Sequence, residues 1–199
     1  IKVAAGERPA FALDSIKAKY DTTYPKEAIP MYFTSNHDEN SWNKSDYATF
    51  PGPAHAPFAV FTQTMGGTVP LVYSGQEEPL LRPLPFFEKD TIIFGKFERA
   101  KFYTTLQKLR AGNEALAADA SFRKINVGDE KAVYAFIREK GEKKILVVLN
   151  LSGKEQAIKI SDKALLGKTY NVFMGTDETL GETEWKMEPW GYAVYEYKK

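Results

Sequence analysis

The chain has 199 residues, of which 43% are hydrophobic and 27% are charged, and its formal net charge is +1. This composition is typical of a globular protein with one large domain or two small ones. Acidic and basic residues alternate along the chain, so no basic stripe predicts nucleic-acid binding. No segment approaches the roughly 18 consecutive apolar residues that predict a membrane-spanning helix.

The sequence contains no cysteine. Disulfides therefore take no part in its stability, and cysteine usage leaves the cellular compartment open. No secretory signal pattern is present, and the first residue is Ile1 and not Met. We therefore expect that a segment upstream was removed or that the chain is an excised piece. The sequence is compatible with a parent protein that is secreted or located at the cell surface.

The first part of the chain predicts a helix and then a strand that ends in a polar motif. Residues 10–19 favour a helix, and Tyr24-Pro25 interrupts the chain after it. The apolar run 29–34 predicts a buried strand, and Asn36-His37-Asp38 follows in a polar loop. Because α/β barrels keep their active sites at the carboxyl ends of the strands, these three side chains are candidates for ligand contact.

A second unit of the same kind follows. Apolar residues at helical spacing predict a helix over 54–65, and Gly66-Gly67 ends it. Residues 69–73 predict another buried strand, and 74–77 form a second polar loop. The order strand, polar loop, helix, strand, polar loop is typical of a parallel barrel or sheet.

Residues 79–95 predict an ordered loop in which Phe86, Phe87 and Phe94 are the apolar anchors. The clearest helix of the chain follows over 97–111, where apolar residues line one face before a Gly-Asn stop signal.

After about residue 119 the apolar pattern changes to a period of two, which is typical of strands. The predicted strands are 132–137, 144–149, 157–160, 170–173 and 191–197. Short strands with turns at this spacing predict an antiparallel β-sandwich. The sequence therefore divides near 112–120, and we predict one domain over 1–115 and a second over 116–199.

Two motifs resemble signatures of the α-amylase family of glycoside hydrolases. Phe33-Thr-Ser-Asn-His-Asp38 is similar to the family's Phe-x-x-Asn-His-Asp pattern. The stretch from Gly67-Thr-Val-Pro70 to Tyr73-Ser-Gly-Gln-Glu77 is similar to its signature at the eighth barrel strand. The resemblance implies an α/β plus all-β fold class. It implies the last two βα units of a TIM-type (β/α) barrel, followed by the family's antiparallel β-sandwich.

The resemblance also implies a chemistry. Retaining glycosidases use one carboxylate as nucleophile and a second carboxyl as acid and base. In similar enzymes the Asp of the first motif is a third carboxylate, which binds sugar hydroxyls beside the reacting carbon. By this resemblance Asp38 stabilises the transition state, His37 donates a hydrogen bond to the same sugar, and Asn36 orients them.

The family's nucleophile Asp and acid Glu belong to strands four and five, and this chain shows no matching motif. Asp14 and Asp21 precede any predicted barrel strand. The resemblance therefore implies part of a retaining enzyme that acts on α-1,4-glucans such as starch and malto-oligosaccharides. The chain alone is expected to be inactive, and either to self-associate through its open strand edges or to need the missing N-terminal barrel portion.

Several assignments keep alternatives. Asp38 is also consistent with a residue that caps a helix or turn, and His37 with a buried histidine whose hydrogen bonds are all made within the protein. Trp42 and Tyr47 fit either stacking on sugar rings or simple packing, and Glu77 fits either a site role or a structural carboxylate. His55 is expected at the surface or in a cap.

Trp185 and Trp190 are expected to pack in the sandwich, with a secondary glucan-binding surface as the alternative. At the level of function, an α-glucan transglycosylase or sugar isomerase of the same family stays open, as does a non-catalytic glucan-binding module. No cofactor or metal is assignable from this chain, because it has only two histidines and no Asp-x-Asp-x-Asp loop. Calcium in the intact enzyme would bind through segments upstream.

Overall fold

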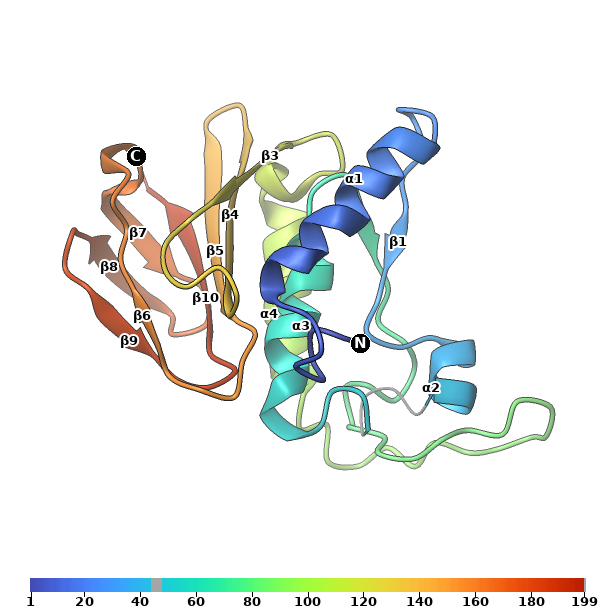
Figure 1. Cartoon of the computed structure of the whole chain (residues 1–199). Coiled ribbons are helices and arrows are strands. Elements are labelled where there is room, and N and C mark those ends of the chain that lie inside the picture. Colours follow the sequence, from blue (N-terminus) through green and yellow to red (C-terminus); the bar gives the residue numbers. More distant parts are fainter. Residues whose placement is uncertain (44–47, 199) are drawn as a thin grey trace.

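The computed structural model describes residues 1–43 and 48–198. Helices with two short parallel strands form one side of the molecule, and a group of antiparallel strands forms the other (Figure 1). The first side contains α1 (Leu13–Thr23), β1 (Met31–Tyr32), α2 (His37–Asn43), α3 (His55–Thr64), β2 (Val69–Pro70) and α4 (Ala100–Gly112), with 3₁₀ turns at Ala10–Ala12 and Gly52–Ala54.

The second side contains a six-stranded and a two-stranded antiparallel sheet. Its elements are β3 (Ser121–Ile125), β4 (Val133–Lys140), β5 (Lys143–Asn150), β6 (Gln156–Ile158), β7 (Gly167–Asn171), β8 (Thr176–Leu180), β9 (Trp185–Met187) and β10 (Tyr192–Tyr197), with 3₁₀ turns at Glu114–Leu116 and Lys163–Leu165. The strand order in the larger sheet is β3-β4-β5-β10-β7-β8, and β6 pairs with β9. β3 and β8 are therefore the edges of the larger sheet.

Both faces of the larger sheet are covered, which explains the apolar sequences of β4 and β5. Tyr134 and Phe136 of β4 belong to a core shared with α3 and α4. Ala135 and Ile137 belong to a second core with the β6–β9 pair, on the opposite face. Because successive side chains of a strand point to opposite faces, a strand covered on both sides is apolar throughout.

The predicted helices agree with the structure to within a few residues. The helix predicted over 10–19 is a 3₁₀ turn followed by α1, while those over 54–65 and 97–111 are α3 and α4. The five predicted strands of the second half are all present. β3, β8 and β9 were not predicted, because much of their surface is solvent-exposed and their sequences are short or polar.

The buried strands predicted over 29–34 and 69–73 are wrong in extent and in burial. β1 and β2 have two residues each, and Ile29, Met31 and Val69 are exposed. Each of these strands pairs only with the other among the described residues. An apolar strand is buried only when neighbours cover it, and here no described strand covers the outer edges.

The stop signal at the end of α3 is confirmed, and both glycines are required there. Gly67 has a φ of +71°, in the left-handed region that side chains disfavour. Gly66 lies so close to β3 that an added Cβ would stand 2.6 Å from the Cβ of Phe122. The turn between α3 and β2 can therefore approach the edge of the larger sheet.

A buried guanidinium joins the two sides of the molecule at this turn. Arg138 of β4 is 0% exposed, and it donates hydrogen bonds to the carbonyls of Thr64 and Met65 at the end of α3. It also donates to the carbonyls of Ser121 and Ala117. Burial, and then the nearby Arg110 guanidinium, lower the pKa of Arg138 to about 10.

Arg110 of α4 holds the same turn from the other side. Its guanidinium donates to the carbonyl of Gln63 at 3.0 Å and to that of Thr68 at 2.7 Å. The backbone that enters β2 is thus fixed by two arginines. No helix among the described residues has both the length and the apolar character needed to cross a membrane.

We predict that Arg138→Met destabilises the fold by about 3 kcal/mol or more, because several buried carbonyls lose a charged donor at once. The midpoint of urea unfolding, followed by circular dichroism, measures this. The matched control is Arg123→Met on neighbouring β3, which removes an exposed ion pair to Asp162 and should change stability by less than about 0.5 kcal/mol. Equal midpoints for the two variants would contradict the role of Arg138.

Candidate active site

The parallel pairing of β1 and β2 brings the two polar motifs to one end of the strands. Met31 lies opposite Val69 and Tyr32 opposite Pro70. The N–H of Leu71 donates to the carbonyl of Tyr32 at 2.9 Å. The residues that follow each strand therefore leave at the same carboxyl edge, as was expected from the sequence order.

The first motif opens a helix, so the predicted polar loop is wrong at this point. His37 and Asp38 are the first two residues of α2, and the side-chain oxygen of Asn36 accepts the N–H of Glu39 at 2.7 Å. This is the geometry of an N-cap, in which a side chain accepts an otherwise unpaired N–H of the first turn. A sequence of Asn before two polar residues and Glu is itself a helix-start signal.

His37 and Asp38 face solvent side by side. Their side chains are 67% and 56% exposed, and Nε2 of His37 lies 3.7 Å from Oδ2 of Asp38. The alternative of a satisfied buried histidine is therefore excluded for His37, and the helix cap belongs to Asn36 and not to Asp38. A hydrogen-bond donor and a carboxylate stand together where a ligand can reach both.

The second motif is bonded directly to the first. The side chain of Gln76 is buried, and its Nε2 donates to Oγ1 of Thr34 at 2.7 Å. Its Oε1 accepts the N–H of Tyr73 at 2.7 Å. Gln76 thus fixes the loop after β2 against the chain that leads from β1 to His37.

The two carboxylates that follow Gln76 are bonded to loop amides. Glu77 accepts the N–H of Gly75 at 3.0 Å, which favours the structural alternative for this residue. Glu78 is buried and accepts the N–H groups of Gly95, Lys96 and Phe97 at 2.9–3.1 Å. The N–H groups of Lys96 and Gly95 contribute most to holding the pKa of Glu78 below its usual value.

The aromatic residues around the site are more exposed than the sequence suggested. Phe86, Phe87 and Phe94, the predicted anchors of the 79–95 loop, are exposed, and polar bonds also hold this loop. Trp42 of α2 is 60% exposed, and its ring lies 5.4 Å from that of Phe86. Tyr47, the other predicted stacking residue, lies outside the described residues.

The second histidine is structural. The expected surface position is wrong, whereas the alternative of a capping position agrees with His55 as the C-cap residue of the 3₁₀ turn Gly52–Ala54. His55 is buried at the start of α3, and its Nε2 lies 2.6 Å from the hydroxyl of Tyr103 on α4. His55 is the first residue of α3 and follows a 3₁₀ turn directly. Its contact with Tyr103 joins two helices that are distant in the sequence, so no local sequence signal indicates it. The predicted packing of the sandwich tryptophans agrees with the contacts of Trp185 and Trp190 with the two cores.

The two aspartates that precede β1 are bonded away from the site. Asp14 accepts the hydroxyl of Tyr134 at 2.8 Å and Nζ of Lys124 at 2.6 Å, so it joins α1 to the larger sheet. Asp21 pairs with Lys17 one turn earlier in α1. Neither carboxylate stands beside Asp38.

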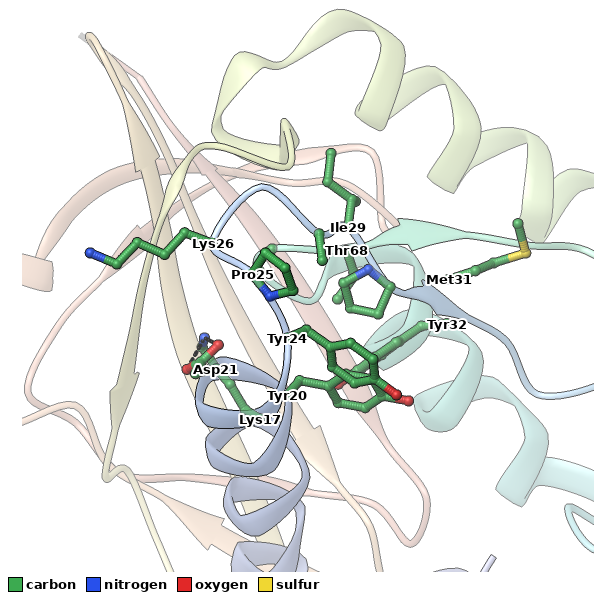
Figure 2. Close-up of a pocket in the computed structure, with 14 residues that line it drawn as sticks. Lys17, Tyr20, Asp21, Tyr24, Pro25, Lys26, Ile29, Met31, Tyr32 and Thr68 are labelled. Atoms are coloured by element: carbon green, nitrogen blue, oxygen red, sulfur yellow. Dashed lines mark hydrogen bonds and ion pairs between the residues drawn. The ribbon is translucent and has the colours of Figure 1, made fainter.

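A separate hollow of about 640 Å³ lies at the amino ends of the two strands (Figure 2). Tyr20 and Tyr24 stack on one another at its wall, with ring centroids 5.3 Å apart, and Tyr32 lies beside them. Burial, and then the neighbouring Tyr20 and Asp21, raise the pKa of Tyr32 to about 12. The hollow is at the opposite end of the strands from His37 and Asp38, so it is not part of their site.

Within residues 1–43 and 48–198, no three acidic or histidine side chains are gathered as a metal site requires.

Residues 133–191 match the family model described as the alpha-amylase SusG C-terminal domain. A crystal structure of a noncanonic maltogenic alpha-amylase AmyB from Thermotoga neapolitana covers 98% of the chain with a TM-score of 0.81 and 19% identity. The chain has the fold of the C-terminal part of an α-amylase.

Other solved structures agree. An alpha-amylase from Lactobacillus plantarum covers 99% of the chain with a TM-score of 0.73 and 17% identity. AmyP in complex with maltose covers 95% with a TM-score of 0.73 and 16% identity. No curated protein sequence gives a significant match.

The chain spans 44–48% of the length of these three structures. The predicted fold class, two βα units of a (β/α) barrel followed by an antiparallel β-sandwich, is confirmed by this α-amylase likeness. The sandwich is unequal, with six strands in one sheet and two in the other.

We predict a pH-dependent change in the loop that Glu78 holds. Its lowered pKa means that the carboxylate's bonds to the loop are complete at neutral pH and are lost as the pH falls through that lowered value. Amide NMR shifts of residues 95–97 should move at a pH below the usual glutamate range, and Glu78→Gln should abolish this movement. The control Glu98→Gln changes an exposed carboxylate of the same segment and should leave it intact. Identical titrations in both variants would contradict the assignment.

Proposed function

We propose that this chain is part of a retaining α-amylase-like glycoside hydrolase that acts on α-1,4-glucans such as starch and malto-oligosaccharides. In this proposal Asp38 stabilises the transition state and His37 donates a hydrogen bond to the same sugar. Residues 1–115 belong to the catalytic barrel, and 116–199 form the C-terminal domain.

The observation that carries the proposal is the hydrogen bond of Gln76 with Thr34. It locks the two motifs together at the carboxyl edge of a parallel strand pair, within an α-amylase fold that extends over nearly the whole chain. The maltose complex of AmyP and its maltotriose complex with the E221Q variant support a malto-oligosaccharide as ligand.

The proposed chemistry needs little movement of these residues. As the glycosidic bond breaks, positive charge develops on the sugar ring, and hydrogen bonds to ring hydroxyls strengthen. The exposed carboxylate of Asp38 accepts from such hydroxyls, while an N–H of His37 donates. Interactions stronger in the transition state than in the bound substrate raise the rate. Asn36 contributes by capping α2, which holds both side chains in place.

The nucleophile and the acid/base carboxyl come from another part of the barrel in this proposal. The outer edge of β1 and the hollow beside it are the place where a further barrel strand would pack. The exposed apolar side chains of Ile29 and Met31 would then be covered. The 199-residue chain alone is therefore expected to be inactive.

We predict that Asp38→Asn in the full-length enzyme lowers kcat on maltoheptaose by a factor on the order of 10² to 10³, because one transition-state hydrogen bond to a charged group is weakened. Steady-state kinetics with a circular-dichroism check of the fold measures this. The control Asp21→Asn makes the same change at the other end of the strands and should retain activity. Near-normal turnover of Asp38→Asn would defeat the proposal, and longer products from maltoheptaose would indicate a transglycosylase.

We also predict that the isolated 199-residue chain self-associates, because β1 presents an open edge with apolar side chains beside it. Sedimentation velocity over a range of concentrations measures this. Met31→Lys places a charge at that edge and should shift the chain towards monomer. A monomeric wild-type chain at all concentrations would contradict the prediction.

A further inference from the structure

The helix that carries His37 and Asp38 is too short to be stable by itself. α2 has seven residues, whereas an isolated helix needs roughly 12 or more to form in water. Its two exposed site residues are not held by a hydrogen bond to each other, since Nε2 of His37 lies 3.7 Å from Oδ2 of Asp38. The positions of both groups therefore depend on the contacts that hold the backbone of α2.

A buried amide holds the chain that enters α2. The side chain of Gln76 is 2% exposed, and its Nε2 donates to Oγ1 of Thr34 at 2.7 Å. Thr34 is also buried, and it stands two residues before the Asn36 cap. Because Oε1 of Gln76 accepts the N–H of Tyr73, the amide is bonded at both ends and cannot turn without losing a buried hydrogen bond.

A second buried amide holds α2 on the far side of Asp38. The side chain of Asn40 is 4% exposed, its Oδ1 accepts the N–H of Leu84 at 2.7 Å, and its Nδ2 donates to the carbonyl of Arg82 at 3.4 Å. The hydroxyl of Ser41 donates to the carbonyl of Leu84 at 2.7 Å. Both backbone groups of Leu84 are therefore bonded to α2, and they tie the helix to the 79–95 loop at the same end of the molecule (Figure 1).

The 79–95 loop is itself fixed, so it can serve as an anchor for α2. Arg82 forms an ion pair with Asp90 and donates to the carbonyl of Thr91 at 2.8 Å. The carboxylate of Glu78 closes the base of the loop through three backbone N–H groups. The short helix is thus held at two points, and Asp38 lies between them.

We propose that Gln76 and Asn40 are positioning residues of the site, which set turnover by fixing where α2 presents the Asp38 carboxylate. Asp38 lies four residues after Thr34 and two before Asn40, so a shift at either anchor moves it. A misplacement of about 1 Å in a catalytic group can cost on the order of 10² in rate. This inference rests on the proposed function and adds the two buried amides on which its rate depends.

The test compares kcat with KM for maltoheptaose in the full-length enzyme. Asn40→Leu and Gln76→Met keep the approximate size of each side chain and remove its hydrogen bonds. Each is expected to lower kcat about tenfold and to change KM less than about twofold, because the groups that contact the sugar are retained while their placement in the transition state is lost. Ser41→Ala removes one bond to Leu84 from a half-buried side chain, so it should keep the fold and lower kcat about twofold.

Asn113→Leu is the matched control. The side chain of Asn113 is 2% exposed, accepts the N–H of Ala115 at 3.0 Å and donates to Glu196 at 2.6 Å, at the junction of α4 and the larger sheet. Its removal should lower the midpoint of thermal unfolding, as Asn40→Leu does, and leave kcat unchanged. Equal kcat values for Asn40→Leu and Asn113→Leu, both folded by circular dichroism, overturn the proposal.

The effect of the two amides must pass through Asp38. In the Asp38→Asn enzyme, Asn40→Leu should lower kcat by less than about twofold, because the carboxylate that it positions is already absent. The same tenfold loss in both backgrounds overturns the inference and leaves the role of Asp38 intact. Near-normal turnover of Asp38→Asn alone overturns the proposed function and the inference together, so the two failures give different results.

Discussion

The guanidinium of Arg138 joins the helical side of this fold to its sheets. It is buried on β4 and donates hydrogen bonds to the last carbonyls of α3. It also donates to the carbonyls of Ala117 and Ser121, where the chain enters the edge strand β3. Because α3 leads through the Gly66-Gly67 turn into β2, this cation fixes where β2 begins. Arg110 restrains the same turn from α4. The register of the strand pair beneath the site therefore depends on interactions made at the opposite end of the strands.

A short series of contacts connects the fixed position of β2 to the site. β2 sets the position of the loop that carries Gln76, and Gln76 holds Thr34 just before the Asn36 cap. The cap then orients the first turn of α2, where His37 and Asp38 stand exposed. Asn40, one turn later, ties the helix to the 79–95 loop. Reactive side chains exposed on a rigid, polar-bonded support suit a site that must recognise a ligand while keeping its geometry.

The sequence predicted well what depends on local pattern. The strong apolar runs of β4 and β5 and the Gly-terminated α3 follow directly from residue spacing. Partly buried strands were not predicted. In β8, for example, Thr176 and Asp177 face solvent at the edge of the sheet. The order of the two polar motifs also predicted that they meet, since parallel strands place their carboxyl ends together.

Other features depend on contacts that a single sequence does not display. His55 is buried because Tyr103, 48 residues later, supplies its partner. Phe86 and Phe87 were predicted as apolar anchors of the 79–95 loop. They are exposed, and polar bonds of Asn40 and Glu78 also hold that loop. The motif Asn36-His37-Asp38 was predicted as a polar loop, yet it begins α2, because the side chain of Asn36 caps the helix by accepting the N–H of Glu39.

The most direct measurement is a crystal structure of the full-length protein with a bound malto-oligosaccharide. We expect sugar hydroxyls within hydrogen-bond distance of the Asp38 carboxylate and of a His37 nitrogen, at about 2.5–3.2 Å. A sugar chain bound elsewhere in the barrel, with Asp38 and His37 left in solvent, would contradict it.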